Sequence, residues 1–144
     1  MLTDDVIERL RAEVPVFITV EAAAELAAVL KGGKAPQRTP AAFVMSVGLQ
    51  VRGPDAVTGM YRQHLSESTI VLLVASRAGD ARGGAAAGRA EPLRDAVVQA
   101  LAGWSPPDAF GPMELTGARL VDFVDGAVFF EVAFATPQLL RIER

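Results

Sequence analysis

The chain has 144 residues, a net charge of −3, one histidine and no cysteine, and a chain of this length can bury a sizeable core without staples. The lack of cysteine and the single His64 exclude a disulfide framework and any thiolate or multi-histidine metal site, so we predict no metal and no cofactor. The length is that of one domain, which we expect to cover residues 1–144. No apolar run reaches the length of a membrane span and the N-terminal segment is acidic, so we expect no export signal and no membrane partner.

The first thirty residues predict two helices with an extended segment between them. Thr3 is a suitable N-cap, and apolar residues at steps of four follow it. The first helix is therefore expected to run to about Glu13, and Pro15 stops it. The β-branched run 16–20 fits either a minor strand or an extended link. Residues 21–30 are rich in alanine and predict a second, short helix.

Two strands are predicted in the middle of the chain. Residues 42–51 alternate apolar with small or polar residues, which indicates a strand with one apolar face. Residues 53–59 predict a turn-forming excursion, and residues 62–76 predict a strand whose second half is apolar on both faces and therefore central in the sheet. No nucleophile motif surrounds His64, so we interpret it as a surface or sheet-face residue and not as a catalytic base.

Two glycine-rich stretches have the composition of nucleotide-binding loops but not the spacing. In residues 31–40, Gly33-Lys34 is followed by Ala-Pro and a strand, whereas a phosphate loop needs Lys-Ser or Lys-Thr and a helix. The glycines of residues 77–89 do not form Gly-x-Gly-x-x-Gly. We therefore interpret both stretches as connections, of which the first is a mobile or interface segment.

A third helix follows, with its apolar residues in a single stripe. Because Pro92 is tolerable only in a first turn, we start this helix near Gly88, and Gly103 ends it. Trp104 then leads to the last part of the chain, and we expect it to anchor the helix end.

Residues 103–136 predict a β-hairpin with a two-residue turn at Asp125-Gly126. Pairing outward from the turn sets Phe123 against Val128, Val121 against Phe130 and Arg119 against Val132. One face of the ribbon then carries Phe123, Val121, Val128, Phe130, Val132 and Phe134. The predicted core anchors are Trp104, Leu101, Phe123, Phe130 and Phe134. Pro137 is expected to break the strand and leave residues 138–144 as a short tail that could pair elsewhere.

The sequence assembles no recognisable reaction centre. It has no Gly-x-Ser-x-Gly elbow, no cysteine nucleophile and no histidine pair, and its carboxylates have no spacing that marks a dyad. We therefore predict a binding or structural protein and not an enzyme. The acidic balance and the lack of a basic helix disfavour sequence-specific binding of nucleic acid.

The order of elements and one motif-like run point to a family. The run Leu101-x-Gly-Trp-x-Pro-Pro is followed by Pro112-Met113-Glu114-Leu115 and by a hairpin that ends Phe134-Ala135-Thr136. Earlier in the chain, Pro40-Ala41-Ala42-Phe43-Val44 enters a strand, a second strand contains Gln63 and ends at Arg77, and Asp80 precedes the third helix. Over nearly its whole length the chain thus resembles the tail-terminator proteins of long, flexible-tailed phages and phage-like gene-transfer particles.

The resemblance implies an α+β fold with a mainly antiparallel sheet packed by helices. With the elements above, this gives a sheet of four strands or slightly more, about three helices and a C-terminal hairpin. The resemblance also implies a ring, usually of six subunits, that caps the tail tube, stops its polymerisation and joins the head-side connector. The expected partners are other copies of the chain, the tail tube protein and the connector. The expected location is the host cytoplasm during assembly and then the virion tail.

Charge is distributed unevenly along the chain, with a net −4 in residues 1–30 and a net +4 in residues 31–62. Such charges either solvate the surface or meet across subunits, where complementary potentials fix the register of association. In a ring, the basic segments 31–40 and 53–62 would reach a neighbouring subunit or the tube. The interface residues that we expect are Lys34, Arg38, Arg52, Asp55, Arg62, Gln63, Arg77 and Asp80. Another tail-completion or neck protein of the same particle, and a small ligand-binding domain, remain as alternatives.

Overall fold

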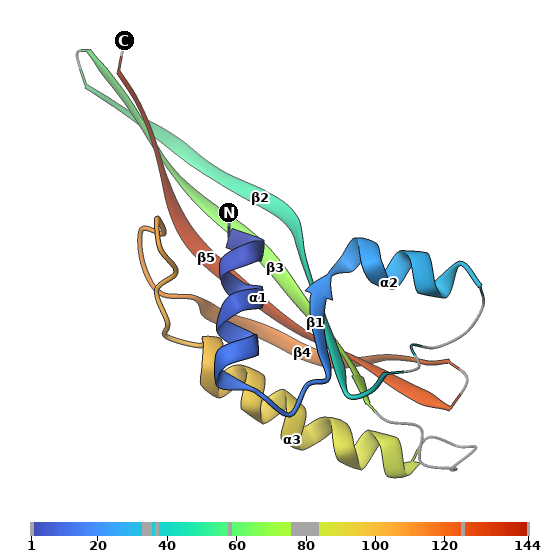
Figure 1. Cartoon of the computed structure of the whole chain (residues 1–144). Coiled ribbons are helices and arrows are strands. Elements are labelled where there is room, and N and C mark those ends of the chain that lie inside the picture. The colour runs from blue at the N-terminus through green and yellow to red at the C-terminus, as the bar shows by residue number, and fades with distance from the viewer. Residues whose placement is uncertain are drawn as a thin grey trace.

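The computed structural model describes residues 2–32, 36, 38–57, 59–75, 84–124 and 126–143. In chain order these residues form α1 (Leu2–Glu13), β1 (Thr19–Ala22), α2 (Ala23–Leu30), β2 (Ala41–Val57), β3 (Met60–Ala75), α3 (Gly84–Leu101), β4 (Glu114–Val124) and β5 (Ala127–Glu143). Figure 1 shows the strands as one long twisted sheet with the helices grouped around its lower half.

The sheet has five strands in the order β1-β2-β3-β5-β4. β1 runs parallel to β2, and the other neighbours are antiparallel, so the sheet is mixed. The predicted α+β class is confirmed, and five strands agree with the prediction of a mainly antiparallel sheet of four strands or slightly more, although one of the four pairings is parallel. The additional strand arises in the segment that the sequence left open, because Thr19–Ala22 lies beside Ala41–Val44. β3 is the middle strand, as its apolar second half predicts.

Helices cover the two faces of the sheet unequally (Figure 1). α1 and α3 pack against one face, here called the α1–α3 face, where Val71, Leu73 and Val132 are buried. On the opposite face, α2 places Leu26 beside Phe43. Because successive residues of a strand point to opposite faces, the strand register assigns each position of the sheet to one face or the other.

Beyond the helices, β2, β3 and β5 continue as a three-stranded arm, which projects to the upper left in Figure 1. The prediction of a turn-forming excursion at residues 53–59 is wrong, because the chain stays in β2 as far as Val57. The Gly53-Pro54 pair lies at an irregularity in the register with β3, where β2 has one residue more than β3. A pair of residues that would indicate a turn by itself thus lies within a strand.

The prediction that Pro137 breaks the last strand is also wrong. β5 continues through Pro137 to Glu143 and pairs with β3 along its whole length. β4 pairs with β5 only as far as Ala135, so Pro137 lies on an edge of the sheet, where its missing N–H costs no ladder hydrogen bond. The carbonyl of Pro137 accepts a hydrogen bond from the Phe110 N–H at 2.8 Å.

α3 is longer at its start than the sequence predicts. It begins at Gly84 and contains Pro92 in its interior, not in its first turn. Pro92 lies on the exposed side of the helix, so the hydrogen bond that its ring removes, to the carbonyl of Gly88, would have faced solvent. The helix ends at Leu101, and Gly103 has the positive φ of 81° that suits a residue just beyond a helix end.

The C-terminal hairpin forms as predicted, although Asp125 of the predicted turn lies outside the described residues, and its register shifts away from the turn end. Phe123 pairs with Val128 as predicted, and Val124 pairs with Ala127. A bulge between Leu120 and Asp122 then leaves Val121 unpaired. The predicted pairs Val121–Phe130 and Arg119–Val132 are therefore wrong. Phe130 pairs with Leu120, Val132 with Ala118, and Arg119 with Glu131.

The five predicted core anchors occupy three different environments. Leu101 and Phe134 are almost fully buried in the core on the α1–α3 face. Phe130 and Trp104 are partly buried and pack against the same core. Phe123 is 46% exposed, so its assignment to the core is wrong. β4 is the edge strand, and the contacts of α3 with the sheet are with β3 and β5.

Candidate functional site

Four of the predicted interface residues lie together in the arm. Arg52 and Asp55 belong to β2, Arg62 and Gln63 belong to β3, and the register places Asp55 opposite Arg62. The Tyr61 hydroxyl donates a hydrogen bond to Gln63 Oε1 at 2.7 Å. These four residues are therefore held on a hairpin of two long strands, and Asp55, which the sequence placed in a turn-forming excursion, belongs to a strand.

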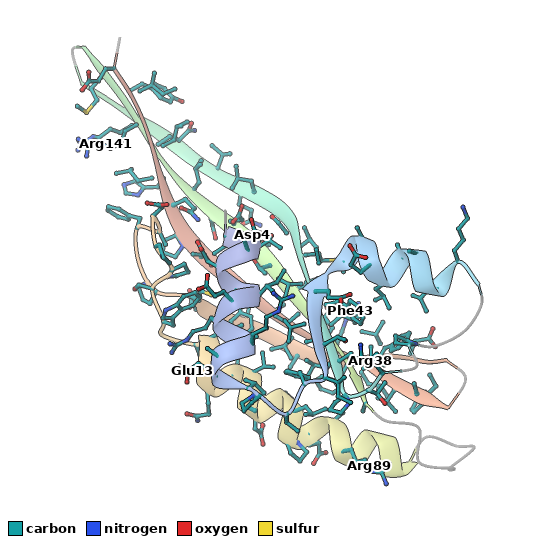
Figure 2. The ribbon with its side chains drawn as sticks, in the orientation of Figure 1. Asp4, Glu13, Arg38, Phe43, Arg89 and Arg141 are labelled. Atoms are coloured by element: carbon teal, nitrogen blue, oxygen red, sulfur yellow. The ribbon has the colours of Figure 1, made fainter. Side chains whose placement is uncertain are left out.

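The other four predicted residues are not part of this group. Arg38 is exposed at the opposite end of the sheet from the arm, as Figure 2 shows by its distance from Arg141 near the tip. Lys34, Arg77 and Asp80 lie outside the described residues. The described part of the chain thus separates Arg38 from the arm and does not gather the predicted residues into one site.

Arg141 is a surface residue of the arm that the sequence interpretation missed. It lies opposite Arg62 in the pairing of β5 with β3, and its Nη2 is 3.8 Å from the sulfur of Met60. Because Pro137 was taken as the end of the strand, residues beyond it had no predicted place. The run of β-compatible residues from Leu139 to Ile142 is the signal that could have placed Arg141 on a strand.

An acidic pocket of about 540 Å³ lies between α1 and the segment where β1 meets α2. It is lined by Asp4, Ile7, Glu8, Arg11, Glu21, Ala22 and Glu25. Arg11 is directed to the backbone, since its Nε and Nη2 donate to the Val20 carbonyl at 3.1 and 2.7 Å. The carboxylates give the pocket the character of a site for a basic group. The described residues contain no group of three or more side chains placed to hold a metal ion.

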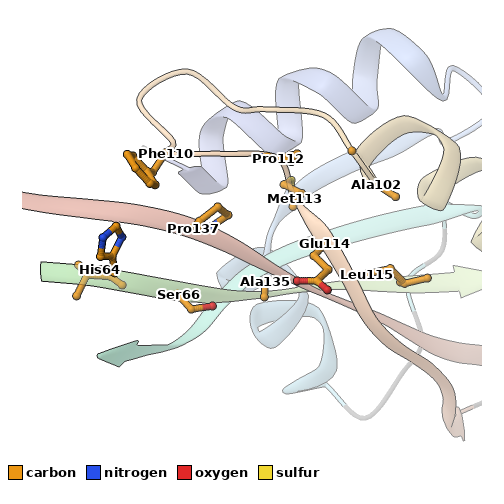
Figure 3. A pocket seen from close by; sticks show the side chains of 12 residues that line it. His64, Ser66, Ala102, Phe110, Pro112, Met113, Glu114, Leu115, Ala135 and Pro137 are labelled. Carbon is orange, nitrogen blue, oxygen red and sulfur yellow. The ribbon is translucent and has the colours of Figure 1, made fainter. Parts of the chain in front are cut away.

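A second pocket, of about 690 Å³, lies where the segment between α3 and β4 crosses the base of the arm (Figure 3). It is lined by His64, Leu65, Ser66, Ala102, Gly103, Phe110, Pro112, Met113, Glu114, Leu115, Ala135 and Pro137. The His64 ring meets the Phe110 ring edge-on, with the ring centres 5.3 Å apart and the planes at 64°. His64 is thus a sheet-face residue packed against an aromatic ring, in a lining that suits an apolar side chain.

Large apolar side chains are exposed along β4, the last strand of the sheet, and along the part of β2 that β1 does not cover. In β2, Val47, Leu49 and Val51 are 49%, 53% and 58% exposed. In β4, Leu120 and Phe123 are 45% and 46% exposed. The sequence placed the three residues of β2 and Phe123 on the apolar faces of strands, because alternation alone does not reveal which strands lie at the edges of a sheet. It gave no such place to Leu120. No helix in the described residues is long and apolar enough to cross a membrane.

Comparison with models of protein families gives a match over residues 2–144 to the family described as phage tail terminator protein. The match covers every helix and strand described above. No curated protein matches the chain.

Proposed function

The chain belongs to the phage tail terminator family, and on this premise we propose that its copies form a ring that caps the tail tube, stops tube polymerisation and offers a joining surface to the head-side connector. Membership of this family makes the protein a structural component of the phage tail, located in the virion tail. We propose that the ring assembles in the host cytoplasm before the tail joins the head.

The observation that carries this proposal is the extent of the family match. Residues 2–144 include the sheet, all the described helices and the arm, so the terminator role is assigned to this domain as a whole. A structural tail family also supports a non-enzymatic role.

Two features of the surface support a ring. A cyclic assembly of identical subunits uses two different patches on each copy, and the outer edge of β4 and the part of β2 that β1 does not cover provide two unlike apolar edges. The acidic pocket beside α1 and the arginines Arg38, Arg62 and Arg141 provide patches of opposite charge, which would steer the association of neighbours. We propose six copies, with the tube protein on one face of the ring and the connector on the other.

The interface residues expected from the sequence remain part of this proposal. Arg52, Asp55, Arg62 and Gln63 would contact a neighbouring subunit or the tube through the arm, which extends beyond the helices (Figure 1). Arg38 would act at the other end of the subunit. Lys34, Arg77 and Asp80 are proposed for the same interfaces from the sequence alone.

Deletion of the gene from the phage or particle that encodes this chain tests the terminator role. A terminator limits tube growth, so we expect tails of uncontrolled excess length, and a plasmid copy of the wild-type chain should restore uniform tails. A neck protein would give a different result. Tails of normal length that fail to join heads would contradict the terminator function and favour the neck alternative.

The ring is tested on the purified protein. Light scattering should give a mass several times that of the 15.2 kDa chain, and negative-stain images of the protein bound to tail ends should average to a six-fold ring. A protein that stays monomeric both alone and with tail tubes would contradict the proposal and favour a small ligand-binding domain.

A further inference from the structure

We propose that neighbouring copies of this chain join by pairing of strands, with Leu49–Val51 of β2 in one copy lying antiparallel beside Ala118–Leu120 of β4 in the next. This inference rests on the proposed ring and names the contact that closes it. The exposed edge of β2 is thus covered by β4 of a second copy, and the exposed edge of β4 by β2 of another. The sheets of neighbouring subunits then form one continuous sheet.

Both strands have a backbone edge that is open in the single chain. β1 pairs with β2 only at Ala41–Val44, so among the described residues β2 has no outer neighbour from Met45 to Val57. β4 is the last strand of the sheet and has no described outer neighbour along Glu114–Val124. Every residue of 46–51 and of 114–123 is exposed. An open edge presents unpaired N–H and C=O groups, which are a template for another strand.

The exposed apolar side chains of the two edges lie on the same face of the sheet. Leu49 and Val51 pair with Glu67 and Leu65 of β3, which share the alternation of buried Val71. Their side chains are therefore assigned to the α1–α3 face.

On β4, Leu120 pairs with Phe130, which in turn pairs with Leu73 of the core. Phe123 pairs with Val128, another member of that core. Leu120 and Phe123 thus belong to the same face as Leu49 and Val51. When one sheet continues into the next under cyclic symmetry, that face remains continuous, so the apolar side chains of the two edges meet side by side.

Strand direction and the bulges limit how the edges can pair. β3, β5 and β4 alternate in direction, so a neighbour's β2 in the same orientation meets β4 antiparallel and continues the alternation. Register breaks on either side of Gly48–Val51 and of Gly117–Leu120 leave these two segments regular. Matching the apolar face in an antiparallel register sets Leu49 opposite Leu120. It also sets Gln50 opposite Arg119, where an amide oxygen meets a guanidinium on the other face.

The part of β2 that β1 does not cover and the outer edge of β4 lie on opposite sides of the sheet, which makes the contact head-to-tail. Head-to-tail contacts generate rings when the rotation closes. Because β1 occupies the first four positions of β2, the neighbour must shift toward the arm. In a closed sheet such a stagger is accommodated when the strands tilt relative to the axis. The arrangement is therefore compatible with a closed ring of subunits.

Engineered cysteines give a direct test, because the natural chain has none. The variants Leu49→Cys and Leu120→Cys are co-expressed, and the purified assemblies are oxidised and run on a non-reducing gel. Directly opposite residues on neighbouring strands bring their Cβ atoms close enough for a disulfide. We expect disulfide-linked dimers from the co-expressed pair, none from either variant alone, and a ladder of higher species from the double variant.

Val16→Cys provides the matched control, since Val16 is 55% exposed in the turn after α1 and away from both edges. Co-expressed with Leu120→Cys, it should give no dimer. Dimers from Leu120→Cys alone would show a self-pairing contact and overturn the proposal. Intact assemblies of the Leu49→Cys and Leu120→Cys pair that yield no dimer would also overturn it.

Charged substitutions test the same contact by another route. Leu49→Asp and Leu120→Asp each place a carboxylate in the apolar strip, so association should weaken by at least about 100-fold, while Val16→Asp leaves it unchanged. Circular dichroism and thermal melting of each variant verify that the subunit is folded. Rings that persist in both edge variants would overturn the edge pairing and leave the terminator function standing. A wild-type chain that forms no ring would count against the terminator function itself.

Discussion

Replacing Arg9 by alanine is expected to lower the free energy of unfolding by about 2 kcal/mol, although the side chain is 32% exposed. Arg9 lies on α1, and its Nε donates a hydrogen bond to the carbonyl of Ala100 in the last turn of α3 at 3.0 Å. The guanidinium carbon also lies 5.2 Å from the centre of the Trp104 ring. A third contact joins Nη1 to Glu13 Oε1 at 3.3 Å, one turn along α1. One side chain thus links the first helix to the end of the third.

The magnitude follows from what each contact contributes. The carbonyls at a helix end lack intrahelical donors, and here the Trp104 N–H is directed to Leu101 while the Gly103 N–H is directed to Met113. The hydrogen bond to Ala100 from a charged donor is therefore worth about 1–1.5 kcal/mol at this part-buried site. The stacking on Trp104 adds about 0.5–1 kcal/mol. The pair with Glu13 is exposed and contributes at most about 0.5 kcal/mol.

Urea unfolding at two protein concentrations measures the loss, because a result independent of concentration shows that assembly does not contribute. Glu13→Ala is the matched control, and it should cost less than about 0.5 kcal/mol. A cycle of Arg9→Ala with Trp104→Leu should give a coupling of about 0.5–1 kcal/mol. Equal losses for Arg9→Ala and Glu13→Ala would refute the reasoning, since the ion pair would then be the only contact that matters.

Three further comparisons use the same unfolding measurement. Phe134→Ala should cost about 3–5 kcal/mol because the ring is buried, and Phe123→Ala should cost less than about 1 kcal/mol in the unassembled chain because Phe123 is half exposed; equal losses would contradict the edge position of β4. Gly103→Ala should lower the free energy of unfolding by about 1–2 kcal/mol, because the φ of Gly103 is 81°. Gly88 lies inside α3 with open space around its Cβ position, so Gly88→Ala should raise the free energy of unfolding by about 0.5–1 kcal/mol. Changes of the same sign in the two variants would contradict this reasoning. Arg119→Ala should cost less than about 1 kcal/mol because its pair with Glu131 is 70% exposed on the arginine side, and a loss above 2 kcal/mol would show that a further contact depends on it.

Local signals predicted the elements that depend on local chemistry. The apolar stripe of α3 and the alternation of the hairpin strands are properties of a few consecutive residues, and the structure has a helix and two paired strands at these places. The predicted turn falls between Val124 and Ala127, which pair, and its Asp125 lies outside the described residues. The central position of β3 was also predictable, because a strand that is apolar on both faces needs cover on both. The α+β class follows from these elements.

Pairing with distant residues decided what the sequence could not. Pro137 and the Gly53-Pro54 pair are strong breakers by themselves, yet each is tolerated in a strand that β3 holds from one side. The bulge at Val121 likewise depends on the pairing with β5 and has no signal in the hairpin sequence. Because both breakers were given their local meaning, the arm was missed, and with it the position of Arg141.

The errors about exposed residues have a different origin. Leu49, Val51 and Phe123 alternate with polar or small residues in the way that half-buried strands do, and the sequence accordingly places them on the apolar faces of strands. The bulge at Val121 adds Leu120 to the same face as Phe123. In the single chain they are exposed, because β2 and β4 are the strands whose outer edges are open. Edge pairing between copies would cover these residues with one another, so the alternation would describe the assembled ring and not the isolated subunit. On this reasoning, the Asp variants at positions 49 and 120 should leave the unfolding free energy of the monomer nearly unchanged while they abolish assembly. A large loss of monomer stability would instead mean that the alternation serves the subunit fold.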